Sequence, residues 1–566
     1  MIDRLLQVAR GAAPADLVVR NARVANVRTL ELETLDVALA GDRIAGLGRY
    51  DGTEEIDAAG RVLAPGLIDS HVHLESSMMS PAQFARAVVP RGTTAVVTDP
   101  HEFANVLGVA GIEYVIRAAD GLPLDVHVML PSCVPATHLE TAGARLEAED
   151  LAPFFGKPHV LGLAEVMNFP GVVSGDPSYL AKIRAAGERP VDGHAPGLTG
   201  PALCAYIAAG PNSEHESVRL EEAMEKLRRG MMIMAREGTV AKNLETLLPL
   251  VRRADAWEVA MCCDDRHPID IAEEGHLDHL LRKAVGLGAD PLVALRAVTL
   301  TPARHYGLRG FGELVPGARA DFVLFDDLRD FRARRVFKDG KEVARDGRVL
   351  RDPPETPPPS RQSLRLPDPF RPDFTVPARS TRVRIVGVVP NQIITQALVE
   401  DAPGSNGALA SDPSRDLIKM AVIDRYTGRA GMGLGFARGL GLKRGAIAST
   451  IAHDSHNIVV AGATDEDMRA AVAEIARIGG GQVVAAGGRI VASLPLPIAG
   501  LVSDRPLEEV ARVAARVRAS ARELGSPLHD PFMTLAFLAL PVIPELRLTD
   551  RGLVDVGRFE IVSLYA

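Results

Sequence analysis

The residues with the clearest chemical potential are His71 and His73, near the end of the segment APGLIDSHVHLE at residues 64–75. The apolar run before them predicts a short strand, in which side chains two residues apart point to the same face. A neutral imidazole is the commonest metal ligand in proteins, so the two histidines could hold one ion together. The same spacing is also compatible with two histidines on a solvated strand face. The other acids and imidazoles of the chain distinguish between these two interpretations.

Further acids and imidazoles follow other apolar runs along the chain. Runs of this kind lie at residues 94–98, 125–130, 160–164, 190–193, 231–235 and 257–263. Acids and imidazoles stand at or just after the ends of these runs and of one short segment before His215. They are Asp99, His101, Glu102, Glu165, His194, His215, Asp264 and Asp265. Imidazole and carboxylate are ligands typical of divalent zinc, manganese and iron. The sequence therefore predicts a metal site where the strand ends meet.

The elements that must position these side chains alternate between strand and helix. Helical periodicity is clearest at residues 217–227, and near-continuous apolar runs are typical of parallel strands buried on both faces. With the His71 strand and a short one before His215, the runs predict a (β/α)8 barrel over residues 65–312. Barrel enzymes carry their sites at the C-terminal rim of the strands, which is where the acids and imidazoles fall.

The segments on either side of the barrel have a different pattern. Short alternating runs separated by turn residues, typical of antiparallel strands, occupy residues 1–64 and return at residues 313–351. Neither set is long enough for a core of its own, so we expect one small β-sandwich into which the barrel is inserted. A Pro-rich linker at residues 352–377 precedes a C-terminal α+β domain at residues 378–566. The predicted fold class is therefore α/β with two additional domains.

Composition narrows the choice of partners. The 566 residues are 47% hydrophobic, which indicates a globular protein with several domains. A formal net charge of −8 argues against nucleic acid or an anionic membrane as the main partner. Four cysteines give no disulfide framework, and the N-terminus lacks the apolar core of a signal peptide, so we expect a cytoplasmic location.

Longer motifs carry a resemblance to a known family. The segment PGLIDSHVH at residues 65–73 resembles the opening motif of the amidohydrolase superfamily. Within this superfamily, further segments resemble the bacterial adenine deaminases. They are HVHLESSM at 71–78, DPHEFANVLG at 99–108, DGHAP at 192–196, DDRHP at 264–268 and, in the C-terminal domain, GAIASTIAHDSHN at 445–457. Phe103 departs from the family pattern, where a smaller aliphatic residue is expected. The resemblance covers nearly the whole chain and implies hydrolysis of adenine to hypoxanthine and ammonia.

The resemblance also implies a metal centre and its ligands. These ligands are His71, His73, Glu165, His194, His215 and Asp264. His71 and His73 would bind one ion with Asp264, His194 and His215 a second ion, and Glu165 would bridge the two. The implied cofactor is a pair of divalent ions, Mn²⁺ or Fe²⁺ with Zn²⁺ as an alternative, whose hydroxide would attack C6 of the purine. Asp264 would act as general base and then as general acid.

Substrate contacts are expected from residues near the ligands. They are Glu75, Ser76, His101, Glu102 and Asp265. Glu75 suits the donor-rich edge of a purine or, when protonated, could protonate a ring nitrogen, so it counts as catalytic beside Asp264 and Glu165. A helix-capping role for Glu102 is an equal alternative.

Other polar groups are open to more than one interpretation. Asp265 could orient His267 instead of contacting substrate, and residues 236–237, Arg-Glu, could form an internal ion pair. His453, Asp454 and His456 could bind another metal or reach the barrel mouth, but a polar turn that holds a core together is the favoured interpretation.

Alternative functions remain open for this scaffold. Another cyclic amide or amine hydrolase is one, because a fold does not fix a substrate. A non-catalytic assembly protein on a barrel without metals is another, although the ligand types at the strand ends argue against it. Cytidine-type zinc deaminases require a Pro-Cys-x-x-Cys motif that the cysteine spacing lacks. The expected partners are adenine and further copies of the chain in a homo-oligomer.

Overall fold

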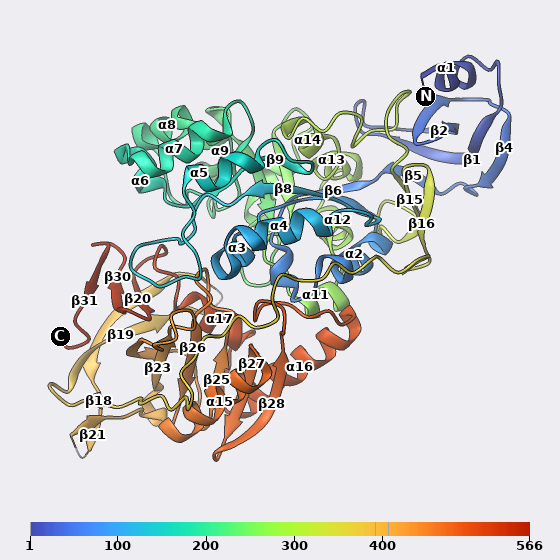
Figure 1. Cartoon of the computed structure of the whole chain (residues 1–566). Coiled ribbons are helices and arrows are strands. Elements are labelled where there is room, and N and C mark those ends of the chain that lie inside the picture. The colour runs from blue at the N-terminus through green and yellow to red at the C-terminus, as the bar shows by residue number, and fades with distance from the viewer. Residues whose placement is uncertain (1, 391, 406) are drawn as a thin grey trace.

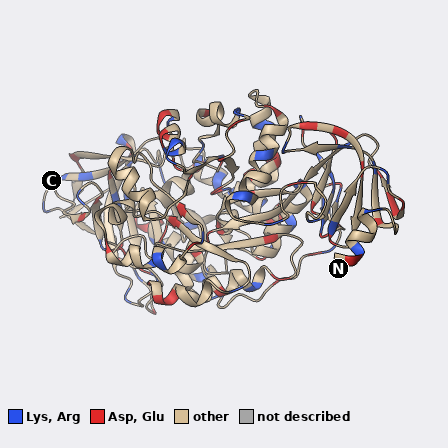
Figure 2. Cartoon of the chain, turned by 90° about the horizontal axis from the view of Figure 1, so that it is seen from above, with Lys and Arg blue, Asp and Glu red and all other residues tan. Residues whose placement is uncertain are grey.

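The computed structural model describes residues 2–390, 392–405 and 407–566. Figure 1 shows the N-terminal β structure at one end, the barrel in the middle and the C-terminal domain below it. None of the helices in these ranges is both long and apolar enough to cross a membrane. Figure 2 shows that basic and acidic residues are interspersed along the ribbon.

The two ends of the first 351 residues join in one sheet. Its strands are β1 (Ala15–Asn26), β2 (Glu31–Ala40), β3 (Arg43–Leu47), β4 (Gly52–Asp57), β5 (Val62–Pro65), β14 (Phe322–Phe325), β15 (Ala333–Lys338), β16 (Lys341–Arg345) and β17 (Arg348–Val349). The antiparallel pair of β5 and β14 connects the two segments, with Leu63 opposite Leu324. The expected sandwich is thus a single hydrogen-bonded sheet of nine strands. Helix α1 (Ile2–Ala9) packs on it.

Eight parallel strands form the barrel. They are β6 (Leu67–Val72), β7 (Thr93–Thr98), β8 (Asp125–Leu130), β9 (Val160–Val166), β10 (Val191–Gly193), β11 (Ser213–Glu214), β12 (Met232–Arg236) and β13 (Val259–Cys262). The first five make one hydrogen-bonded sheet and the last three another. The barrel closes through a parallel bridge between Val72 and Asp264. Apolar side chains such as Ile68, Val97 and Met234 fill its interior, as the near-continuous apolar runs predict.

Helices follow the barrel strands. Their bounds are α2 (Pro81–Val88), α3 (His101–Leu107), α4 (Val109–Ala118), α5 (Ala148–Leu151), α6 (Phe169–Ser174), α7 (Pro177–Ala186), α8 (Gly200–Ala209), α9 (Leu220–Arg228), α10 (Leu244–Val251), α11 (Pro268–Glu273), α12 (Leu277–Gly286), α13 (Pro291–Ala297) and α14 (Leu300–His305). The helix expected at residues 217–227 begins only at Leu220. Ser217 belongs to the preceding loop, because its carbonyl accepts from Asn243 at 3.0 Å and its hydroxyl accepts from Lys226 at 3.0 Å.

The C-terminal domain combines an eight-stranded sheet with helices. The sheet order is β20 (Thr395–Asp401), β19 (Arg382–Val388), β24 (Met432–Arg438), β23 (Leu417–Ile423), β26 (Ile458–Gly462), β25 (Ala446–Ser449), β27 (Gly481–Ala486) and β28 (Arg489–Pro495). The helices of the domain are α15 (Asp465–Ile478), α16 (Leu507–Glu523) and α17 (Pro531–Phe537). One small sheet contains β18 (Val376–Pro377), β21 (Gly404–Ser405) and β22 (Ala408–Leu409). Another contains β29 (Leu546–Thr549), β30 (Gly552–Asp555) and β31 (Glu560–Val562).

The C-terminal domain packs on the rim where the barrel strands end. Figure 1 shows α16 beside α11, at the lower side of the barrel. The Asn457 side chain donates to the Thr141 carbonyl at 2.7 Å, and the Thr549 hydroxyl donates to the Leu139 carbonyl at 2.7 Å. These bonds join loops of the barrel to strand ends of the other domain, so the rim is covered.

Candidate active site at the barrel rim

His71 near the end of β6 and His73 just after it present two imidazoles to the rim. His73 Nε2 lies 3.3 Å from Glu165 Oε1 and 3.3 Å from Asp264 Oδ1, and His71 Nε2 lies 3.5 Å from the same Asp264 oxygen. The Nδ1 of His73 lies 3.0 Å from the Asp99 carbonyl, to which it can donate. A backbone acceptor on one ring nitrogen leaves the other free as a ligand, which is the arrangement typical of metal-bound histidines.

Glu165, at the end of β9, faces imidazoles with both of its oxygens. Its Oε1 faces His73, whereas its Oε2 lies 2.7 Å from His194 Nδ1 and 3.3 Å from His215 Nε2. Burial alone would raise the pKa of Glu165, but the neighbouring imidazoles outweigh it and hold this pKa well below its usual range. The structure therefore brings together all six side chains expected as metal ligands.

This cluster fits a divalent metal. The Nε2 of His71 is buried and has no hydrogen-bond partner among the described residues. Burial lowers the pKa of His71 and so favours the neutral, ligating imidazole. Its donor atoms lie within 4.8 Å of those of His73 and Asp264, and also of those of Glu165 and His215. Buried imidazoles and ionised carboxylates at such distances have the chemistry of a binding site for a divalent cation.

The end of β6 and the residues just after β13 meet at a seam, where an isolated bridge pairs Val72 with Asp264. The Asp264 N–H donates to the His71 carbonyl at 3.0 Å, although Asp264 has a left-handed φ of 54° that non-glycine residues rarely adopt. Asp69 reinforces the seam: its Oδ1 accepts from the N–H groups of Cys263 at 3.1 Å and His71 at 3.4 Å. Its Oδ2 lies 3.2 Å from His276 Nε2. One buried carboxylate thus fixes the backbone beside two of the expected ligands.

Arg236 and Glu216 belong to the site although the sequence interpretation missed them. Arg236 Nη1 donates to Asp264 Oδ2 at 2.5 Å, and its guanidinium pairs with both oxygens of Glu216. The expected ion pair between Arg236 and Glu237 is wrong, because Glu237 accepts from Lys283 at 2.6 Å instead. Burial would raise the pKa of Asp264, but Arg236 and the imidazoles hold it well below its usual range. A local signal for Glu216 existed, since it directly follows His215 at a strand end.

His101 lies between the metal-ligand cluster and the C-terminal domain. Its Nδ1 is 3.0 Å from Asp99 Oδ2 and 3.6 Å from Glu165 Oε1, while its Nε2 is 3.8 Å from Asp454 Oδ1. His101, which was expected to contact the substrate, therefore lines the cavity beside the cluster and also approaches the expected metal ligand Glu165. Its position next to Glu165 makes it a group that could orient the cluster.

The other expected substrate residues divide into two layers. Asp265 lines the cavity and accepts from the Ser76 hydroxyl at 2.5 Å. Glu75 lies behind the lining, where its Oε1 accepts from the Phe103 N–H at 3.0 Å. Burial, aided by the charge of Glu102, raises the pKa of Glu75 to about 8. The geometry therefore argues against direct contact between Glu75 and a ligand bound in this cavity.

Two polar interpretations of the rim need correction. His267 is not oriented by Asp265: its Nδ1 lies 3.3 Å from Asp530 Oδ2, on a residue that caps α17. Glu102 does lie in the first turn of α3, but its Oε1 contacts His453 Nδ1 at 3.2 Å. Each of these side chains is therefore bonded across the interface with the C-terminal domain.

The segment at residues 453–456 is more than a polar turn. His453 and Asp454 are buried against the barrel mouth and line the same cavity as the metal-ligand cluster. The favoured interpretation as a turn that holds a core is therefore wrong for these two residues. His456 fits it, since its Nδ1 accepts from the Ala452 N–H at 3.2 Å within the loop.

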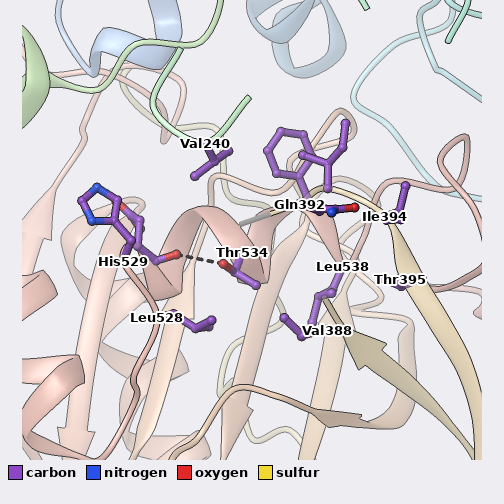
Figure 3. Close-up of a pocket in the computed structure, with 12 residues that line it drawn as sticks. Val240, Val388, Gln392, Ile394, Thr395, Leu528, His529, Thr534 and Leu538 are labelled. Carbon is purple, nitrogen blue, oxygen red and sulfur yellow. Dashed lines mark hydrogen bonds between the residues drawn. The ribbon is translucent and has the colours of Figure 1, made fainter. Parts of the chain in front are cut away.

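The cavity over the metal-ligand cluster leaves about 40 Å³ of space for water-sized groups. Apolar side chains of the C-terminal domain cover the charged rim, namely Ile393, Phe537, Leu540 and Ile543. A second pocket, with about 30 Å³ of such space, adjoins it and shares Ile393 and Phe537 with it. Figure 3 shows Val240 of the barrel facing Thr534 and Leu538 of the C-terminal domain across this outer pocket.

Comparisons with known proteins agree with this architecture. Residues 62–343 match the amidohydrolase family, and residues 392–560 match the adenine deaminase C-terminal domain. An adenine deaminase of Desulfatibacillum aliphaticivorans is 50% identical over 100% of this chain and 99% of its own. Adenine deaminase 2 of Carboxydothermus hydrogenoformans is 49% identical over the same shares of both chains.

A third relative and one solved structure complete the comparison. An adenine deaminase of Cereibacter sphaeroides is 48% identical over 99% of both chains. The structure of a beta-aspartyl dipeptidase from Fervidobacterium islandicum AW-1 matches 59% of this chain and 98% of its own, with 18% identity and a TM-score of 0.44. The identity and the full-length coverage of the three deaminases establish that the chain belongs to the adenine deaminase family of amidohydrolases.

Proposed function

We propose that this protein hydrolyses adenine to hypoxanthine and ammonia in the covered cavity at the barrel rim. The observation that carries the proposal is the cluster of four histidines and two carboxylates from separate strand ends, closed over by apolar side chains of the C-terminal domain. Full-length relatives named adenine deaminase support the choice of substrate. The reaction adds water at C6 of the purine, breaks the bond from C6 to the amino nitrogen, and leaves a carbonyl.

The proposed cofactor is a pair of divalent ions, Mn²⁺ or Fe²⁺ with Zn²⁺ as the alternative. His71, His73 and Asp264 would hold one ion, and His194 and His215 the other. Glu165 would contact both, which is supported by the way its two oxygens face different histidines. When bound, such ions lower the pKa of a water to about 7 and so supply hydroxide at neutral pH.

Asp264 is the proposed proton carrier. It would accept the proton of the attacking water and deliver it to N1 of the purine or to the departing amine, as general base and then general acid. Its Oδ1 faces His71 and His73, and its Oδ2 is held by Arg236 at 2.5 Å. Arg236 is in turn fixed by Glu216, so the carboxylate is oriented before substrate enters.

The remaining lining residues would hold the purine. Asp265, oriented by the Ser76 hydroxyl, offers an acceptor to the substrate edge. Phe537 and Ile393 offer apolar surface to the ring faces and exclude water from the rim. Glu102 lies behind this lining, where it would position Ser76 and His453. Glu75 also lies behind it and would fix the start of α3 through the Phe103 N–H.

A direct assay tests the proposal. Protein loaded with Mn²⁺ is expected to release ammonia from adenine in a one-to-one ratio with hypoxanthine and to hold two metal ions per chain. Hydantoin and dihydroorotate serve as comparison substrates, because hydrolysis of either one in place of adenine would identify a different cyclic amide hydrolase. Metal content near zero in a protein inactive on all three would contradict the enzymatic proposal. Gel filtration of the same sample tests the expected homo-oligomer.

A further inference from the structure

Asp454 is a buried carboxylate that the proposed reaction does not yet use. It belongs to the loop between β25 and β26 of the C-terminal domain, is 3% exposed, and lines the cavity. Its Oδ1 lies 3.8 Å from His101 Nε2 and 3.7 Å from His453 Nδ1. Its Oδ2 is buried with no hydrogen-bond partner among the residues that the structure describes. A buried acceptor without a donor is unfavourable, so this oxygen indicates a ligand that supplies one.

The position of Asp454 relative to the metal-ligand cluster limits which part of a ligand it can meet. His101 separates the two: its Nδ1 lies 3.6 Å from Glu165 and its Nε2 lies 3.8 Å from Asp454. Asp454 is therefore one imidazole ring farther along the cavity than Glu165. A planar bicyclic ligand with its reacting atom at the cluster would extend its other ring toward Asp454.

A purine base carries two kinds of N–H donor, at opposite ends of the molecule. The amino group on C6 must lie at the metal-ligand cluster, because C6 is the atom that is hydrolysed. The second donor is the N–H of the imidazole ring, which lies at the other end of the bicycle. We propose that Asp454 accepts a hydrogen bond from this imidazole N–H and so makes the enzyme select the free base. This inference rests on the proposed deamination of adenine.

The same contact would exclude nucleosides. A sugar on N9 removes the proton that Asp454 would accept and places bulk against the loop that carries His453. The cavity offers little room for it, because Phe537 and Ile543 close the adjoining wall. A site that uses a buried acceptor for a substrate N–H discriminates strongly against analogues that lack this donor.

A cycle of two substrates and two variants tests the inference. The substrates are adenine and 4-aminothieno[2,3-d]pyrimidine, which keeps the amino-pyrimidine ring but has no imidazole N–H. Asp454→Ala is expected to lower kcat/KM for adenine about 10- to 100-fold, because a charged hydrogen bond is lost, and to change kcat/KM for the thieno analogue less than about threefold. Asp454→Asn keeps an acceptor oxygen and is expected to recover part of the preference for adenine.

Two controls separate this role from a structural one. Asp467→Ala removes a buried carboxylate of α15 outside the cavity, and it is expected to leave the ratio of the two substrates unchanged. Metal content is measured in every variant. Equal losses on both substrates in Asp454→Ala, or loss of a metal ion from it, would overturn the inference while wild-type deamination of adenine still stands. Failure of the wild type to deaminate adenine would instead remove the proposed function itself.

Discussion

The two walls of the cavity are built in different ways. The barrel wall takes its side chains from strand ends, and bonds such as those of Asp69 fix the backbone at the β6–β13 seam. The opposite wall takes Asp454 from a loop and Phe537 from the end of a helix in another domain, which contacts the barrel through loops and through α16 against α11. Groups that must hold geometry during chemistry are best placed on rigid elements, whereas loops suit selection between substrates. We therefore assign reaction to the first wall and choice of substrate to the second.

The largest effect is expected from the centre of the barrel wall. Glu165→Gln keeps the size of the side chain but removes the charge that faces His73, His194 and His215. An amide is a poor ligand for two cations, so we expect loss of at least one metal ion and a fall in kcat of about 10³-fold or more. Elemental analysis and steady-state kinetics on adenine measure both.

A matched change on the surface controls for the substitution. Glu149→Gln alters an exposed carboxylate on α5 of the same barrel and is expected to keep full metal content and activity. Retention of both metal ions by Glu165→Gln would contradict the bridging role. Retention of a normal rate would show that the barrel wall is not where the reaction occurs.

Arg236 is expected to give the second largest effect. Arg236→Gln leaves Asp264 and Glu216 buried without their cation, which is unfavourable by about 3–5 kcal/mol for a buried pair. We expect kcat/KM to fall about 100-fold and Tm to fall as well. Arg236→Lys keeps the charge but can reach only one of the two carboxylates well, so it should recover part of the activity. Wild-type kinetics in Arg236→Gln would contradict the role of this ion pair.

The seam should give a smaller effect, on metal affinity. Asp69→Asn keeps an oxygen for the N–H groups of Cys263 and His71 but weakens both bonds and the contact with His276. Groups that orient metal ligands cost about 10- to 100-fold in metal affinity when changed. Titration of the apo-protein with Mn²⁺, followed by activity and by bound metal, measures this. Unchanged affinity would show that the backbone bridge alone holds the seam.

Sequence patterns were sufficient for the barrel wall because its positions are set locally. His71 and Glu165 follow apolar runs, and the end of such a run is also the end of a parallel strand. Arg236 was misjudged although a local rule applied to it. Neighbouring residues of a strand point to opposite faces, so Arg236 reaches Asp264 inside while Glu237 reaches Lys283 on α12.

The C-terminal wall could not be derived from sequence in the same way. Asp454 stands far along the chain from His101, and their approach to 3.8 Å depends on how two domains dock. No periodicity within either segment encodes that docking. A buried polar turn and a substrate-facing loop also have the same residue types, so only the cavity distinguishes them.

The smallest effect is expected from Phe537, in the C-terminal wall of the cavity. Phe537 stacks on His453 with ring centroids 4.7 Å apart and forms part of the apolar cover. Phe537→Leu keeps an apolar group but loses the aromatic face, so we expect KM for adenine to rise a few-fold, with kcat and metal content within about twofold of wild type. A buried Phe→Leu change also lowers Tm, and Phe532→Leu on the same helix provides the matched control for that loss. A fall in kcat or a lost metal ion specific to Phe537→Leu would mean that the C-terminal wall takes part in the chemistry, and the division between the two walls would fail.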